Sequence, residues 1–166
     1  MARRRWVLGA GAALLLAGCG FQLRRPPDFA FDSLYLAGAE SSPLAAELRR
    51  NLSSVPGLRV MSGSQPRNAA QVVLDLQPEV RQKVVVGQSA SGQVREFQLR
   101  TRVTFGLRTP EGRQLIAPTE LMQQREISFN ESAVLAKEAE EVLLYRDMQT
   151  DLVQQLMRRL AALKAL

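Results

Sequence analysis

Hydrophobic and polar residues alternate most regularly between Val94 and Arg108, the pattern of a β-strand with one buried face. The apolar parity is Phe97, Leu99, Val103, Phe105 and Leu107, and the polar parity is Glu96, Gln98, Arg100, Arg102 and Thr104. Related patterns predict three further strands, at 33–37, at 70–86 with a break or bulge at Pro78, and at 115–129. Residues 58–61 could form one more brief strand.

Two segments change to helical periodicity. The first starts at Ser42-Pro43, places Leu44, Leu48 and Leu52 on one face, and ends at Pro56-Gly57. The second runs from Glu131 to Leu163 without proline or glycine. Its apolar stripe is Leu135, Val142, Tyr145, Met148, Leu152, Leu156, Leu160 and Leu163. The order of elements predicts an α+β fold, with two helices packed on one face of a four-stranded, mostly antiparallel sheet in a two-layer sandwich.

Composition limits the chemistry open to this chain. In 166 residues, about one domain's length, there is no histidine and one cysteine, which excludes Ser-His-Asp and Cys-His catalysis, zinc fingers and disulfide scaffolds. Aromatic residues make up 5%, which argues against nucleic acid as a partner because there are few rings for base stacking. The formal net charge of +6 falls to +3 without Arg3, Arg4 and Arg5, so charge alone says little about anionic partners.

The N-terminal residues have the three-part design of a secretory signal. Met1–Arg5 is basic and Trp6–Ala17 is apolar. That apolar run would rise only about 18 Å as a helix, well short of the roughly 30 Å hydrocarbon core of a membrane. The segment Leu16-Ala17-Gly18-Cys19 resembles the lipobox of bacterial lipoproteins, in which the cysteine is lipidated and becomes the new N-terminus. Gly20, rather than aspartate, follows the cysteine, which is typical of lipoproteins sent to the outer membrane.

The resulting domain division has three parts. Residues 1–18 are predicted to be a lipoprotein signal peptide, 19–32 a tether lipidated at Cys19, and 33–166 the folded α+β domain. Pro26-Pro27 favours an extended tether.

Residues for catalysis are not evident. Glu138 and Glu141 are spaced to share a helix face with Glu140 beside them, but they have no partner base, and such runs are usually solvated surface. The glycines of 87–92 lack the lysine and the strand-to-helix context of a phosphate loop, so this segment is interpreted as a hairpin. We therefore expect no enzyme, no metal site and no cofactor.

Five cations are the candidate binding residues. Lys83, Arg95, Arg100 and Arg102 fall on the predicted central strands, and Lys137 lies near the start of the long helix. Cations beside a sheet face could hold the phosphates of an anionic lipid or glycolipid. The alternative is that they are ordinary solvated residues that keep the sheet soluble.

Several short motifs, in a fixed order, resemble one family. They are Cys19-Gly20-Phe21-Gln22-Leu23-Arg24, Pro43-Leu44 at the start of the first helix, Ser91-Gly92-Gln93 leading to Glu96-Phe97-Gln98-Leu99, Ala133–Glu138, and Leu156-Met157-Arg158-Arg159-Leu160. Together they resemble the lipopolysaccharide-assembly lipoprotein family LptE, also called RlpB, over essentially the whole mature chain.

The resemblance implies a non-enzymatic role at the outer membrane. Members of this family are lipid-anchored at its periplasmic side, plug the LptD β-barrel in a one-to-one complex, help it assemble, and bind lipopolysaccharide during transport to the outer leaflet. Of the family's glycolipid-binding positions, Lys137 is matched, whereas Ala90 replaces the basic residue before the Ser-Gly-Gln loop, leaving Lys83 or Arg95 as substitutes. The alternative is a periplasm-facing outer-membrane lipoprotein that binds another envelope ligand without a barrel partner.

Overall fold

The computed structural model describes residues 27–39 and 41–166. The predicted signal peptide, Cys19 and most of the tether lie outside these residues. The elements are β1 (Ser33–Ala37), α2 (Pro43–Ser53), β2 (Arg59–Met61), a 3₁₀ turn (Arg67–Ala69), β3 (Val72–Leu76), β4 (Val80–Gln88), β5 (Val94–Arg108), β6 (Gln114–Ser128), a second 3₁₀ turn (Glu131–Ala133) and α3 (Val134–Ala161).

The described strands form one six-stranded sheet organised around β5. β6 pairs antiparallel along one edge of β5, while β4 and then β3 occupy the other edge end to end, also antiparallel. β1 lies parallel to both β3 and β2. The α+β class is confirmed, but the number of four strands was wrong. The segment 70–86 is split around Pro78, which cannot donate to a strand ladder, and 58–61 supplies β2.

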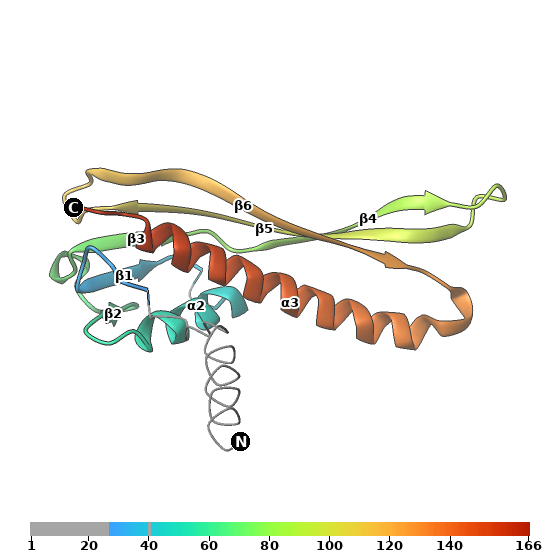
Figure 1. Cartoon of the computed structure of the whole chain (residues 1–166), viewed down its shortest axis with the longest axis horizontal. Helices are drawn as coiled ribbons and strands as arrows, with labels where there is room; N and C mark the ends of the chain where they lie inside the picture. Colours follow the sequence, from blue (N-terminus) through green and yellow to red (C-terminus); the bar gives the residue numbers. More distant parts are fainter. Residues whose placement is uncertain (1–26, 40) are drawn as a thin grey trace, which may run out of the picture.

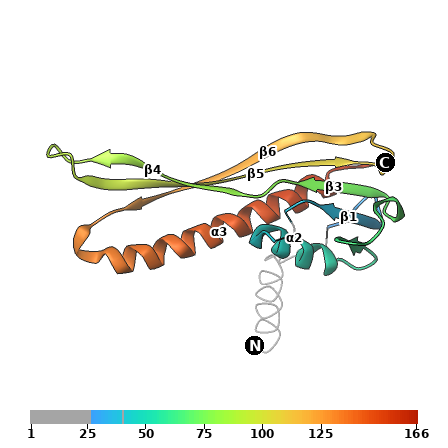
Figure 2. The ribbon, with the colours of Figure 1, turned by 180° about the vertical axis from the view of Figure 1, so that it is seen from behind.

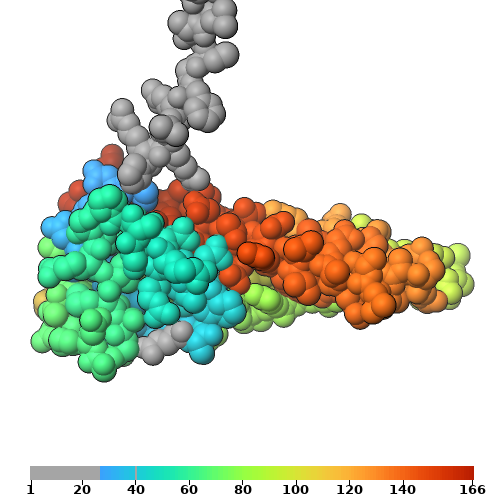
Figure 3. All heavy atoms as spheres, turned by 90° about the horizontal axis from the view of Figure 1, so that it is seen from below, coloured from blue at the N-terminus to red at the C-terminus, as the bar shows by residue number. Residues whose placement is uncertain are grey.

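Both helices lie on the same face of the sheet, and the molecule is elongated (Figure 1). We call the end that contains β1, β2, β3 and α2 the base. The arm is the opposite end, made of β4, residues 94–102 of β5, residues 122–128 of β6 and residues 134–147 of α3. The view from behind shows the same division, with the β4–β5 hairpin forming the tip of the arm (Figure 2). Seen from the helix side, α2 flanks α3 in the base, and α3 continues over the arm (Figure 3).

The main hydrophobic core belongs to the base. Leu44, Leu48 and Leu52 of α2 are fully buried, as the four-residue spacing predicts. α2 starts at the cap residue Ser42, whose hydroxyl accepts a hydrogen bond from the Ala45 amide at 3.2 Å. Phe31, which falls in the predicted tether, is buried in this core. The packed part of the chain therefore starts before Ser33.

The stripe along α3 is core only in its second half. Met148, Leu152, Leu156 and Leu160 are buried, whereas Leu135 is 82% exposed and Val142 68% exposed. The prediction that the whole stripe packs against the sheet was wrong for the arm. Here α3 contributes only to a small cluster in which Leu144 and Tyr145 pack against Phe97, Leu99, Ile127 and Met148.

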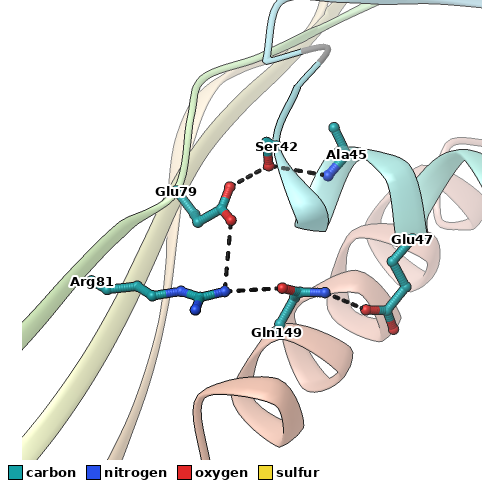
Figure 4. Close-up of polar contacts among 6 residues, drawn as sticks. All are labelled: Ser42, Ala45, Glu47, Glu79, Arg81 and Gln149. Carbon is teal, nitrogen blue, oxygen red and sulfur yellow. Dashed lines mark hydrogen bonds and ion pairs between the residues drawn. The ribbon is translucent and has the colours of Figure 1, made fainter. Parts of the chain in front are cut away.

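A polar network joins the arm to the base (Figure 4). Gln149 of α3 is almost buried; its amide donates to Glu47 of α2 (Nε2 to Oε2, 2.6 Å) and its carbonyl accepts from Arg81 of β4 (Oε1 to Nη2, 3.1 Å). Arg81 also approaches Glu79 at 3.8 Å, and the Ser42 hydroxyl donates to the same carboxylate. This junction network connects α2, α3 and β4 where the two halves of the molecule meet.

Candidate functional site

The predicted cations lie on both faces of the sheet. Lys83 is opposite Leu99 in the register, so it shares the face that is turned towards α3. Arg100 and Arg102 have the other parity of β5 and point to the open face. The structure thus brings Lys83 and Lys137 together and separates both from Arg100 and Arg102. The face of the sheet on which a side chain lies depends on strand pairing, which the residue type does not reveal.

Lys83 is held between α3 and an aromatic ring. Its Nζ lies 2.6 Å from Oε2 of Glu141 and 4.4 Å from the centroid of the Phe97 ring. The ring face attracts the cation and the carboxylate neutralises it. These two partners hold the ammonium group between β5 and α3.

Lys137 lies on the first turns of α3. Its Nζ donates to Oγ of Ser128 at 3.0 Å and to Oε2 of Glu140 at 2.9 Å. A lysine this close to a helix N-terminus opposes the helix dipole, so these two acceptors offset an unfavourable placement.

The two lysines border a small cavity of about 50 Å³, which we call the lysine pocket. Apolar side chains from β5, β6 and α3 line it alongside carboxylates of α3. The full lining is Lys83, Phe97, Ile127, Ser128, Phe129, Val134, Lys137, Glu138 and Glu141. An anionic amphiphile needs cations beside an apolar surface, and this pocket has both. A phosphate of the ligand would replace the glutamate carboxylates as the partner of the two lysines.

Tyr145 lies beside this pocket and contacts β4. Its hydroxyl donates to the carbonyl of Gln82 at 3.0 Å, and the guanidinium of Arg81 lies 5.3 Å from its ring centroid. Burial raises the pKa of Tyr145, the Glu141 carboxylate raises it further, and Arg81 opposes both effects. The phenol therefore stays protonated and keeps its hydrogen bond to the strand.

Arg100 and Arg102 form the centre of a second cationic surface, the arginine face, on the open side of the arm. Arg100 lies in a row between Gln82 and Gln124, and its Nε donates to Oε1 of Gln98 at 2.6 Å. Arg102 approaches Glu120 at 3.8 Å. This surface is mixed in charge, and it also exposes Val80 and Met122, the register neighbours of Arg102.

Arg95 belongs to neither surface. It lies at the start of β5 near the tip of the arm, is exposed, and its Nη2 donates to Oε1 of Gln93 at 3.3 Å. The structure therefore places Lys83, rather than Arg95, beside Lys137.

A larger groove lies at the base and contains none of the predicted site residues. It has a volume of about 520 Å³, and its lining includes Gly106, Arg67, Asp75 and Arg108. Arg108 and Asp75, from the adjacent strands β5 and β3, pair with each other in its lining (Nε to Oδ2, 2.7 Å), so much of its charge is internally compensated.

Sequence reasoning missed the partners of the lysines. Glu140 and Glu141 were interpreted as solvated surface, yet they pair with Lys137 and Lys83. The Glu140–Lys137 pair has the i, i+3 spacing of helix neighbours and was detectable from sequence. The Glu141–Lys83 pair joins two elements far apart in the chain, and only the tertiary structure reveals it.

Among residues 27–39 and 41–166, no group of three histidine, cysteine, aspartate or glutamate side chains is arranged to hold a metal ion. The helices in this part of the chain are too short or too polar to cross a membrane.

The fold is a two-layer α+β domain with cationic residues on both faces of its sheet. The chain belongs to the lipopolysaccharide-assembly LptE family, whose sequence model matches residues 31–160. This match confirms the resemblance inferred from the motifs. The family is one of lipopolysaccharide-assembly lipoproteins and is not enzymatic.

Solved structures of lipoproteins share the fold. The solution structure of the uncharacterized lipoprotein B from Nitrosomonas europaea has 30% sequence identity and a TM-score of 0.73, covering 86% of this chain and 91% of its own. The rare lipoprotein B from Shewanella oneidensis has 21% identity and a TM-score of 0.66, with coverage of 78% and 94%. A minor lipoprotein from Acinetobacter baumannii has 22% identity and a TM-score of 0.62, with coverage of 81% and 94%. A comparison with curated protein sequences gave no match.

Proposed function

We propose that this chain is an outer-membrane lipoprotein, anchored through Cys19 at the periplasmic side, that plugs an LptD-like β-barrel and helps it to assemble. In this role it binds lipopolysaccharide and assists its insertion into the outer leaflet. Membership of the lipopolysaccharide-assembly family is the observation that carries the proposal. The mixed charge of the arginine face supports it, because the lumen of a membrane barrel is polar.

The two cationic surfaces have different roles in this proposal. The lysine pocket holds glycolipid, since Lys83 and Lys137 lie beside the apolar Phe97, Ile127 and Phe129. The arginine face contacts acidic and polar groups of the barrel lumen, since Arg100 lies in a row between Gln82 and Gln124.

Co-purification tests the barrel partner. A tag placed after Leu166 allows the full lipoprotein to be recovered from outer membranes in mild detergent. We expect one far larger β-barrel protein in a one-to-one ratio. Recovery of the lipoprotein alone would contradict the plug and favour a free-standing binder of another envelope ligand.

Binding of purified lipopolysaccharide tests the division of roles. Lys137→Gln removes one charged contact and is expected to weaken binding about tenfold, which corresponds to about 1.4 kcal/mol. Arg100→Gln should leave glycolipid affinity within about twofold, because Arg100 is on the other face of the sheet.

The matched control is Arg159→Gln, which removes an exposed cation from the other end of α3. An equal loss in all three variants would show that only the net charge matters. That result would refute a specific lysine pocket.

A further inference from the structure

One side of α3 is covered in the base and exposed in the arm. Val153 and Leu160 are fully buried, in the core that contains the leucines of α2. Leu135 and Val142 each precede one of them by eighteen residues, which is about five turns of an α-helix, so they project in the same direction. In the arm this direction is open, because Leu135 is 82% exposed and Val142 68% exposed. Ala139 lies between these two on the same side and is also exposed.

We call Leu135, Ala139 and Val142 the exposed stripe, and the element missing over it is a helix. In the base, α2 lies beside α3 and the two helices are joined by the hydrogen bond between Gln149 and Glu47. α2 does not continue into the arm, where α3 is the one helix of the described chain (Figure 3). The stripe has the spacing of four and then three residues by which one helix packs against another.

Two charged residues flank the exposed stripe. Glu138 lies one turn before Val142, and Arg146 lies one turn after it. Both side chains are exposed, and neither forms an ion pair with another of the described residues. The exposed stripe is therefore acidic towards the start of the helix and basic towards the base.

This order of charges is complementary to itself. When two copies of the helix lie antiparallel about a twofold axis, the basic end of each stripe meets the acidic end of the other. A parallel pair would instead place Glu138 beside Glu138 and Arg146 beside Arg146. An acyl chain would cover the three apolar side chains but leave both charges without a partner. Ala139 lies near the middle of the stripe, and its short side chain allows two helices to approach closely.

We propose that the exposed stripe is a docking site for a second copy of this chain, paired antiparallel along α3 with Arg146 of each copy beside Glu138 of the other. The contact spans about three turns of helix, so the association is weak and reversible. Anchoring through Cys19, as proposed above, brings copies together in one membrane and raises their effective concentration. The pair concerns copies outside a barrel, so a one-to-one complex with a barrel neither requires nor excludes it.

Photo-cross-linking tests the site in the full-length lipoprotein in native outer membranes. A benzophenone amino acid is introduced at Leu135, on the stripe, or at Asp147, which is exposed on the same helix but turned about 120° away. We expect Leu135 to give a product with the mass of two chains, joined within one turn of Arg146, and Asp147 not to give it. A Leu135 cross-link to another protein or to lipopolysaccharide instead of a second copy, equal two-chain product from both positions, or no cross-link from Leu135 would overturn the proposal.

Exchange of the two charges tests the antiparallel order. Arg146→Glu or Glu138→Arg alone should reduce the two-chain product from position 135 about tenfold, because like charges then meet. The double variant carries both changes in each copy, so it should restore the product to within about twofold. Arg159→Glu makes the same change of net charge at an exposed position on the other end of α3, and should leave the product within about twofold.

Circular dichroism verifies that each variant is folded, as expected for substitutions at exposed positions. Undiminished product in the single variants, an equal loss in Arg159→Glu, or no restoration in the folded double variant would refute the antiparallel pair.

Discussion

The junction network predicts that Gln149 fixes the arm to the base. Replacing Gln149 with methionine keeps the side-chain volume and helix propensity but removes both of its hydrogen bonds, to Glu47 and to Arg81. Gln149 is 8% exposed, so little water reaches its side chain to replace these hydrogen bonds.

The magnitude follows from the exposure of the partners. A hydrogen bond to a charged group contributes about 1.5–3 kcal/mol when buried, but Arg81 is 40% exposed at its side chain and water can replace part of the interaction. We therefore expect the two bonds together to contribute about 1–2 kcal/mol. For a chain of this size that corresponds to a decrease of roughly 3–6 °C in Tm.

The assay is thermal and urea unfolding of the full lipoprotein in detergent, followed by circular dichroism. The matched control is Gln154→Met, on the same helix, because Gln154 makes no side-chain hydrogen bond to the described residues. We expect the control to stay within about 0.5 kcal/mol of the unsubstituted protein. Equal stability of the two variants would refute the role assigned to the junction network.

Two further predictions concern the arm. Thr101 is fully buried, and its hydroxyl has no hydrogen-bond partner among the described residues. In urea unfolding, Thr101→Val should therefore stabilise the protein by about 1 kcal/mol, whereas Thr101→Ser should destabilise it. A loss of stability in the valine variant would contradict the unpaired state of the hydroxyl. The raised pKa of Tyr145 means that its neutral form is favoured in the folded protein, so its contribution to stability is complete below the ordinary phenol pKa of 10.0 and is lost as the pH rises through the folded value. The difference between the ultraviolet titrations of the unsubstituted protein and of Tyr145→Phe should show a phenol that ionises at higher pH than in the unfolded chain. A difference curve that matches the unfolded chain would contradict the assignment.

Much of the fold was predictable because its signals are local. The parity of β5 repeats every two residues, and Leu99, Val103, Phe105 and Leu107 are all buried. The single strand expected around Pro78 was close to correct, since β3 and β4 lie end to end along β5. The sequence indicated a brief strand at 58–61 but did not decide it, because a three-residue strand such as β2 gains its stability from a neighbour and not from its own sequence.

The candidate site was predictable only in part. Lys137 and the strand cations could be named from residue type and motif. Their division into a lysine pocket and an arginine face could not, because it depends on the register that places Lys83 opposite Leu99.

The sequence by itself determined which side of each element is apolar, since periodicity is a property of neighbouring residues. Only the tertiary structure decided which apolar sides find a partner. Leu152 and Leu135 continue one stripe along α3, yet the base covers the first residue and the arm leaves the second exposed. The physical reason is that burial requires two surfaces, and the length of β4, β5 and α3 beyond α2 leaves the arm with only one helix over its sheet.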